Sequence, residues 1–316
     1  MMKFLKLLKE TYLSWDKNDP WAKSAIIAYY ALFSLPSLLI IIVHFAGVFF
    51  GREAVQGRIT GEISGLIGEG SADLIQAMII NSALSESSVL FVIFGVGILI
   101  FGATGVFFQL QRALNNIWSV RSKKNNIIDT LKRRAVSFGM VLIIGLLMLI
   151  SLVLSSAINA LSEFLGNYYS ELSSNLIEVF NFIISQIFIT ALFAAIFTLL
   201  PDVKIKWKTN LIGAFMTSLL FLGGKYLIGF YFAKSDPASV YGAAGSVVLV
   251  LLWVYYTCLI LFFGAEFTVN WALHRNIKIE PTDNATLSYE LEMEKLREFK
   301  RKIEEDKKKA QTLENN

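Results

Sequence analysis

Residues 243–271 read AAGSVVLVLLWVYYTCLILFFGAEFTVNW, a run in which Glu266 is the only charged residue. A helix of this length extends for roughly 44 Å. The hydrocarbon core of a bilayer is about 30 Å thick and is crossed by about 20 helical residues. The run therefore predicts a transmembrane helix that is long enough to tilt or to extend past the interface.

The rest of the chain is similarly apolar, and its composition excludes most classes of soluble protein. Of its 316 residues, 55% are hydrophobic and 17% are charged, and the mean hydropathy is +0.56. Such a chain is too apolar for an ordinary soluble enzyme. We therefore predict an all-α integral membrane protein, a bundle of six transmembrane helices. The predicted spans run approximately over Ala25–Phe50, Val89–Phe108, Ala135–Leu161, Ile177–Leu200, Leu211–Phe232 and Ala243–Trp271.

Lysine and arginine residues gather in alternate connections between the predicted spans. The N-terminal segment, the second and fourth loops and the C-terminal tail are rich in them, whereas the first and fifth loops hold few and the third holds none. Basic loops stay on the cytoplasmic side, so both termini are predicted to lie inside. Tryptophans near the span ends on that side suit the headgroup layer: Trp15, Trp21, Trp118, Trp207 and Trp271.

The N-terminal segment, residues 1–23, precedes the predicted transmembrane domain of residues 24–272 and has an amphipathic pattern. Its apolar side chains lie on one helical face, opposite Lys3, Lys6 and Lys9. This pattern predicts a helix that lies in the cytoplasmic interface, with a disordered start as the alternative. The apolar face consists of Phe4, Leu5, Leu8, Tyr12 and Trp15.

Two further segments lie outside the predicted spans. The first outer loop, Gly51–Ser88, has a helical apolar spacing broken by glycines, which predicts two short amphipathic helices. They form either a cap packed on the bundle or a lid over an outward-facing opening. The charged cytoplasmic tail, residues 273–316, is predicted to form a helix with a thin apolar stripe. This stripe is a candidate contact for a homo-oligomer or a partner protein.

The chain lacks the residue clusters that common enzymes need. It has one cysteine, Cys258, and two histidines, His44 and His274, neither of which has a helical neighbour that could share a metal ion. No phosphate-binding glycine loop, nucleophile elbow or Cys-x-x-Cys motif occurs. An enzyme, including one that cleaves RNA, is therefore disfavoured. No cofactor, no metal and no nucleic-acid partner are expected.

The second loop, Arg112–Arg134, has the charge density that phosphate contacts use. Its predicted cytoplasmic position accounts for that charge without any ligand. Anionic membrane lipids are the next candidates, because juxtamembrane basic clusters attract their headgroups. We therefore assign cytoplasmic contacts with anionic lipids to Arg112, Arg133 and Arg134.

Two ionisable residues, Lys225 and Glu266, fall inside predicted spans, where a charge is costly and indicates function. Glu266 lies about 8 Å from the inner end of the sixth span, and Lys225 lies about 21 Å along the fifth. A direct ion pair is therefore not expected. Glu266 is predicted to be buried or to face a cavity. Lys225 either belongs to the same polar pathway or extends outward to the interface.

Proline, hydroxyl and small residues predict a polar pathway and close helix contacts. Pro36 frees a backbone carbonyl beside Tyr29, Tyr30 and Ser34, which line a polar pocket or serve packing alone. Small residues of the sixth span permit close helix packing, and its aromatic residues fall in mid-span. The assigned packing residues are Gly242, Gly245 and Gly264, and the pathway also includes Tyr241, Ser246, Trp253 and Tyr256.

Short motifs are spread in order over most of residues 25–271. They are AYYALFS at Ala28–Ser34, QRALNNIW at Gln111–Trp118, Leu200 and Pro201 with Trp207, Gly213 with Ala214, VYGAAGS at Val240–Ser246, LWVYY at Leu252–Tyr256 and GAE at Gly264–Glu266. Together these motifs resemble the YihY/BrkB family of bacterial inner-membrane proteins. In that family, the proline after the first motif usually falls one residue later than Pro36 does here.

The resemblance implies a multi-pass protein of the bacterial cytoplasmic (inner) membrane. That family has carried a ribonuclease label, a link to serum resistance and virulence, and suggestions of lipid or solute transport. Three functions remain open for this chain. The first is transport of a lipid-like or anionic amphipathic substrate through a cavity between the first, fifth and sixth spans. The second is a channel, and the third is a non-catalytic scaffold in envelope assembly. Membrane lipids are its expected partners.

Overall fold

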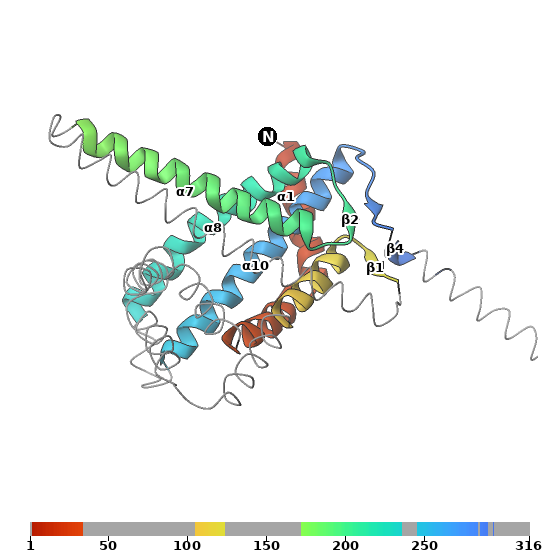
Figure 1. The fold of residues 1–316 in the computed structure, drawn as a ribbon, viewed down its shortest axis with the longest axis horizontal. Helices are drawn as coiled ribbons and strands as arrows, with labels where there is room; N and C mark the ends of the chain where they lie inside the picture. Colours follow the sequence, from red (N-terminus) through yellow and green to blue (C-terminus); the bar gives the residue numbers. More distant parts are fainter. Residues whose placement is uncertain are drawn as a thin grey trace, which may run out of the picture.

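The computed structural model describes residues 2–33, 105–123, 172–235, 245–283, 285–289 and 293, and this part of the chain is mostly helical (Figure 1). Two helical segments cover residues 20–33 and 105–117. The other helices are α1 (Met2–Lys17), α7 (Leu172–Leu199), α8 (Trp207–Ser235) and α10 (Gly245–His274).

Three of the described helices are long and apolar enough to cross a membrane, which confirms transmembrane helices in the second half of the chain. Their spanning stretches are Phe182–Leu199, Trp207–Tyr231 and Val247–His274. They coincide with the fourth, fifth and sixth predicted spans. The first three predicted spans and the first outer loop lie wholly or mainly outside the described residues.

Helices α8 and α10 run in opposite directions and meet through two glycine–threonine contacts. An added Cβ at Gly213 would lie 1.8 Å from Thr268 Oγ1, and one at Gly264 would lie 1.8 Å from Thr217 Oγ1. Each threonine hydroxyl donates to the carbonyl of the glycine four residues before it, at 2.7 Å. Small residues of this kind let membrane helices approach closely, and the threonines satisfy their own hydroxyls.

Helix α7 also packs against α8, in part through polar contacts. Gln186 Nε2 donates to Ser218 Oγ at 2.7 Å, and the hydroxyls of Thr190 and Ser218 are 2.9 Å apart. Nearer the start of α8, Asn210 Nδ2 donates to the carbonyl of Ala194 at 2.9 Å. Hydrogen bonds between membrane helices add to packing because lipid offers no competing partner.

Helix α1 packs along α10, as the red and blue helices of Figure 1 show. Its buried face consists of Leu7, Thr11 and Trp15, and Trp15 Nε1 donates to the carbonyl of Leu259 at 3.2 Å. Of the predicted apolar face, Trp15 lies in this contact, whereas Phe4, Leu5 and Tyr12 are exposed, as is Leu13. The interfacial position of this helix stays a prediction.

The chain also forms two small antiparallel sheets that the all-α prediction omits. Strand β1 (Val120–Ser122) pairs with β4 (Ala285–Leu287), and β2 (Val203–Lys204) pairs with β3 (Glu280–Pro281). The start of the charged tail is thus extended where a helix was predicted. Its backbone groups are satisfied by distant loops, and such long-range pairing leaves no periodic signal in the tail itself.

Candidate functional site

A buried carboxylate lies where α1 meets α10. Glu266 of α10 is only 2% exposed. Its carboxylate accepts a hydrogen bond from Asn18 Nδ2, and its backbone carbonyl accepts one from Asn270 Nδ2 at 3.0 Å. Lys23 supplies an electrostatic attraction. Burial disfavours the charged form of a carboxylate; the hydrogen bond from Asn18 and the attraction of Lys23 oppose that effect, although Lys23 and Glu266 form no direct ion pair in the described part of the chain.

The turn between α1 and the helix at residues 20–33 positions the partners of Glu266. Asp19 adopts φ 48°, a conformation that Asp and Asn accept more readily than most residues. Its carboxylate accepts from the backbone N–H of Ala22 at 3.3 Å, and Pro20 is the first residue of the helix. Lys23 Nζ donates to the carbonyl of Asn18. The turn therefore holds Asn18 through its main chain and presents its side chain to Glu266.

Lys23 is half-buried just before the predicted first span. Burial lowers the pKa of Lys23 from its ordinary value, whereas the carboxylates of Asp19 and Glu266 act in the opposite direction. Desolvation disfavours the ammonium form, so this cation depends on its anionic neighbours. Lys23 also lines a groove, which connects the carboxylate site to a larger surface.

The groove lies between the helices at residues 20–33 and 105–117 and has a volume of about 900 Å³. Phe108, Arg112 and Asn116 are four residues apart and form the exposed ridge of the second helix. Strand β1 and Lys123 close one end. Among the described lining residues four are basic and none is acidic; the basic ones are Lys23, Arg112, Arg121 and Lys123.

Asp202 fixes the wall of this groove from behind. Its carboxylate accepts hydrogen bonds from Asn115 Nδ2 at 2.8 Å, from Ser122 Oγ at 2.7 Å and, more weakly, from Gln111 Nε2 at 3.4 Å. Its backbone N–H donates to Asn115 Oδ1 at 2.8 Å, and its carbonyl accepts from the N–H of Thr282 at 2.9 Å. Asp202, in the loop before β2, thus contacts the 105–117 helix and β1 through its carboxylate and the tail through its backbone carbonyl.

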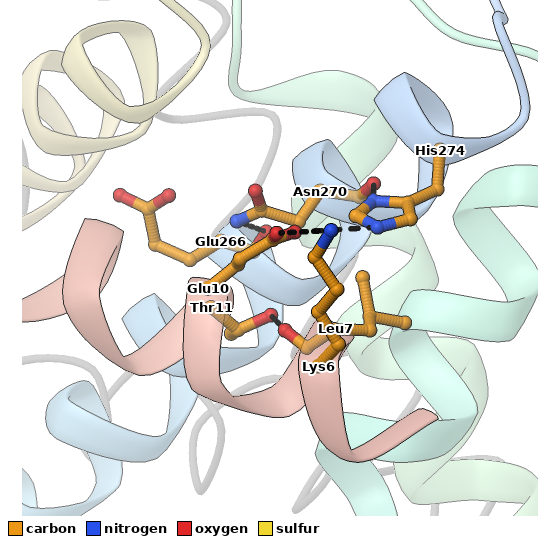
Figure 2. Close-up of polar contacts among 7 residues, drawn as sticks. All are labelled: Lys6, Leu7, Glu10, Thr11, Glu266, Asn270 and His274. Carbon is orange, nitrogen blue, oxygen red and sulfur yellow. Dashed lines mark hydrogen bonds and ion pairs between the residues drawn. The ribbon is translucent and has the colours of Figure 1, made fainter. Parts of the chain in front are cut away.

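Figure 2 shows a second polar contact between α1 and α10. His274 Nε2 lies 3.2 Å from Glu10 Oε2, and His274 Nδ1 lies 3.0 Å from the carbonyl of Asn270. Lys6 Nζ is 3.9 Å from Glu10. The Glu266 carboxylate points away from this group, so the two carboxylates have separate surroundings.

The predicted pathway residues do not gather around Glu266. Tyr29 is exposed and contacts the ring of Tyr30, at 5.9 Å between centroids. The ring of Tyr30 covers Gly105, where an added Cβ would lie 2.5 Å from Tyr30 Cδ1. This contact joins the 20–33 helix to the 105–117 helix, and neither tyrosine is among the described residues that line the groove.

Other predicted residues lie in the contact between α8 and α10. Trp253 contacts the ring of Phe221 at 5.9 Å between centroids, and the hydroxyl of Tyr256 would lie 2.3 Å from a Cβ added at Gly224. Lys225 follows Gly224 and is half-buried. Because Tyr256 is ten residues from Glu266, Lys225 lies roughly 15 Å from Glu266 along the helix axis, consistent with the expected absence of a direct pair.

The remaining predicted residues divide between described and undescribed parts of the chain. Gly245 is buried at the start of α10, Gly264 lies at the close contact with Thr217, and Arg112 lines the groove. Outside the described residues lie Ser34, Pro36, Tyr241, Gly242, Arg133 and Arg134, together with the side chain of Ser246.

Sequence reasoning missed the residues that surround Glu266 and the groove. Asn18 and Lys23 precede the first span and look like ordinary interfacial residues. Asp202 follows Pro201 in a short loop, and a lone acid in a loop that is otherwise basic was the signal that could have identified it. The alternation of basic loops gave Arg121 and Lys123 a sufficient topological explanation, so neither was assigned a ligand.

Comparison with known proteins identifies the family. A family model described as virulence factor BrkB matches residues 12–286. A UPF0761 membrane protein of Psychromonas ingrahamii is 28% identical over 270 residues, which cover 83% of this chain and 86% of the relative. A UPF0761 membrane protein of Pseudoalteromonas atlantica is 26% identical over 244 residues, which cover 77% and 78%.

A more distant relative has a different kind of name. The ribonuclease-like protein YfkH of Bacillus subtilis is 22% identical over 284 residues, which cover 89% of this chain and 99% of the relative. No solved structure matches the chain. Since the family model spans most of the sequence and the UPF0761 relatives are named as membrane proteins, the chain belongs to the BrkB family of membrane proteins.

Proposed function

We propose that this protein transports a lipid-like or anionic amphipathic substrate across the bacterial inner membrane, with both termini in the cytoplasm. One observation carries the proposal. A buried carboxylate in an apolar helix, Glu266, contacts Asn18 and is attracted by Lys23, which lines a basic groove. An ionisable residue inside a membrane helix is costly to maintain and marks an ion or substrate pathway.

The groove supplies the two kinds of contact that an amphipathic anion needs. Basic side chains attract a negatively charged headgroup. Phe108 and Ile26, which are 51% and 44% exposed, line the same groove and offer apolar surface to a chain. The sequence has no nucleotide-binding phosphate loop, so uphill transport would use an ion gradient or a partner ATPase. Glu266 is the residue that binds the coupling proton or cation in this proposal.

Replacing Glu266 by Gln tests the proposal. The Gln oxygen still accepts the hydrogen bond from Asn18, so the folded structure is retained while the ionisable group is lost. We expect vesicles with the wild-type protein to move fluorescent phosphatidylglycerol between leaflets, and Glu266→Gln vesicles to match protein-free ones. Glu266→Asp shortens the side chain by one methylene and should recover part of the rate.

Glu10→Gln is the matched control, because Glu10 is a carboxylate on the same α1–α10 contact but pairs with His274. It should keep the wild-type rate. A stable Glu266→Gln protein with full activity would refute the role of the carboxylate. Ion conductance without lipid movement would favour a channel instead, and neither activity would favour a scaffold in envelope assembly.

A further inference from the structure

The groove between the 20–33 and 105–117 helices has a donor set that suits one chemical group. Arg112 carries a planar guanidinium group, which binds phosphate oxygens in pairs, and Lys23 and Lys123 carry compact ammonium groups. Arg121 adds a further positive charge to the lining. Lys123 Nζ donates to the carbonyl of Asp283 at 3.0 Å. An ammonium has three donors, so this contact leaves donors for a ligand.

The polar lining is held in place before any ligand arrives. Gln111, Asn115 and Ser122 line the groove and all donate to Asp202. These three donors satisfy hydrogen-bond acceptors of the Asp202 carboxylate, which is not itself among the described lining residues, and the charged residues of that lining are all basic. Such a preorganised arrangement lowers the ordering cost of binding. The volume of about 900 Å³ exceeds the space that a phosphate alone would fill, and apolar Ile26 and Phe108 lie beside the basic residues.

Lys23 belongs to the groove and to the Glu266 site at the same time. It lines the groove, and its ammonium donates to the carbonyl of Asn18, whose side-chain amide donates to Glu266. Lys23 also attracts the Glu266 carboxylate electrostatically. When the Lys23 ammonium turns toward an anion in the groove, its electrostatic attraction for the Glu266 carboxylate becomes weaker. The buried carboxylate then has Asn18 as its remaining polar partner, and an unpaired buried charge is strongly disfavoured.

We propose that the groove binds an anionic phosphodiester headgroup, and that Lys23 couples this binding to the uptake of one proton by Glu266. This inference rests on the proposed function and names the part of the substrate that the protein recognises. The site gains one negative charge from the phosphodiester and loses one when a solvent proton binds Glu266 Oε, so its total charge is unchanged. By linkage, proton binding at Glu266 strengthens anion binding by the same factor.

Other charged groups near α10 are already engaged elsewhere. On α1 and α10, Glu10 contacts Lys6 and His274, at the far side from the Glu266 carboxylate (Figure 2). Asp19 caps the 20–33 helix and attracts Lys23. Among the described residues, Lys23 is therefore the cation that links Glu266 to the groove. Removing the Lys23 ammonium should uncouple anion binding in the groove from proton uptake by Glu266.

The binding site is tested by titrating the detergent-solubilised protein with phosphatidylglycerol and counting bound lipids by native mass spectrometry. Arg112→Gln and Lys23→Gln should each weaken binding roughly tenfold, since a hydrogen bond to a charged group is lost. Lys278→Gln is the matched control, because Lys278 is exposed, lies outside the groove and contacts only Glu280 among the ion pairs of the described residues. Equal binding by all four proteins would refute the site.

A second comparison distinguishes lipid from soluble phosphodiesters. Glycerophosphoglycerol carries the same headgroup without acyl chains. If it displaces phosphatidylglycerol at similar concentration, the groove recognises a free phosphodiester; if it fails to compete, the apolar part contributes and the ligand is a lipid. Either outcome supports the phosphodiester site, whereas binding of phosphatidylcholine as tight as phosphatidylglycerol would overturn the requirement for an anion.

The coupling is tested by following a pH indicator in weakly buffered solution as phosphatidylglycerol binds. At a pH high enough for Glu266 to be ionised before the lipid binds, the wild-type protein should take up close to one proton for each lipid bound, and Glu266→Gln and Lys23→Gln should take up none. Lipid binding without proton uptake by the wild-type protein would refute the coupling and leave the binding site and the transport proposal standing. If the wild-type protein binds lipid and takes up the proton but moves no lipid between leaflets, the transport proposal alone is refuted.

Discussion

The contact between Gly264 and Thr217 offers a sharp test of how α8 and α10 pack. Replacing Gly264 by Ala adds a methyl group that would lie 1.8 Å from Thr217 Oγ1 and 2.7 Å from Thr217 Cβ. Rotation of the hydroxyl can relieve the first overlap. It cannot relieve the second, because Cβ is bonded to the backbone of α8.

The expected loss of stability follows from the distance of 2.7 Å between the added methyl group and Thr217 Cβ. Carbon atoms pack at about 3.5–4.0 Å, so the helices must separate by about 1 Å at this point, and a gap of that size removes a quarter to a half of the local dispersion attraction. The paired contact of Gly213 with Thr268 lies one helical turn away and loosens with it. Overpacked buried sites lose about 1–3 kcal/mol, which is roughly a 5- to 150-fold change in the folding equilibrium.

The single cysteine supplies the assay. Cys258 is buried in α10, so a thiol-reactive fluorophore reaches it only when that helix is released from its neighbours. The rate of labelling during heating therefore reports unfolding without an introduced probe. We expect Gly264→Ala to label at a lower temperature than the wild-type protein, and Gly213→Ala to behave similarly.

Two controls decide whether packing is the cause. Gly223→Ala places a methyl on α8 where no atom of the described residues lies within 4 Å, so it should leave the labelling temperature unchanged. Thr217→Gly removes the Cβ that the new methyl meets, so adding Gly264→Ala to Thr217→Gly should cost less than it costs alone, a coupling that the double-mutant cycle measures. Equal labelling temperatures for Gly264→Ala and Gly223→Ala would refute the reasoning.

Two further predictions concern the hydrogen bonds around Asp202 and the direction of insertion. Asp202→Asn replaces an acceptor oxygen by an amide that faces other donors, so it should cost about 1–3 kcal/mol of stability, seen as earlier Cys258 labelling. The exposed Asp283→Asn should cost under about 1 kcal/mol, and equal effects would contradict the structural role of Asp202. A cysteine at Ser173 should react with an impermeant reagent in intact cells and one at Lys123 should not, and the reverse pattern would overturn the predicted topology.

The sequence alone was sufficient for the class of protein and for part of the candidate site. An apolar run of membrane-spanning length satisfies its backbone hydrogen bonds internally only as a helix, so the last three spans could be located from local composition. The same argument identified Glu266, because a carboxylate in such a run is conspicuous whatever surrounds it. Its predicted burial needed no knowledge of its neighbours.

Only the tertiary structure determined which groups meet. Asn18 and Lys23 are more than 240 positions from Glu266, and Asp202 is 87 positions from Asn115. Such contacts depend on how α1 packs along α10 and on how the tail strands pair with distant loops. Both are decided by shape and hydrogen bonding between segments rather than by the periodicity within one. The glycines at α8 and α10 were visible in the sequence, but their threonine partners emerged only from the register in which the two helices cross.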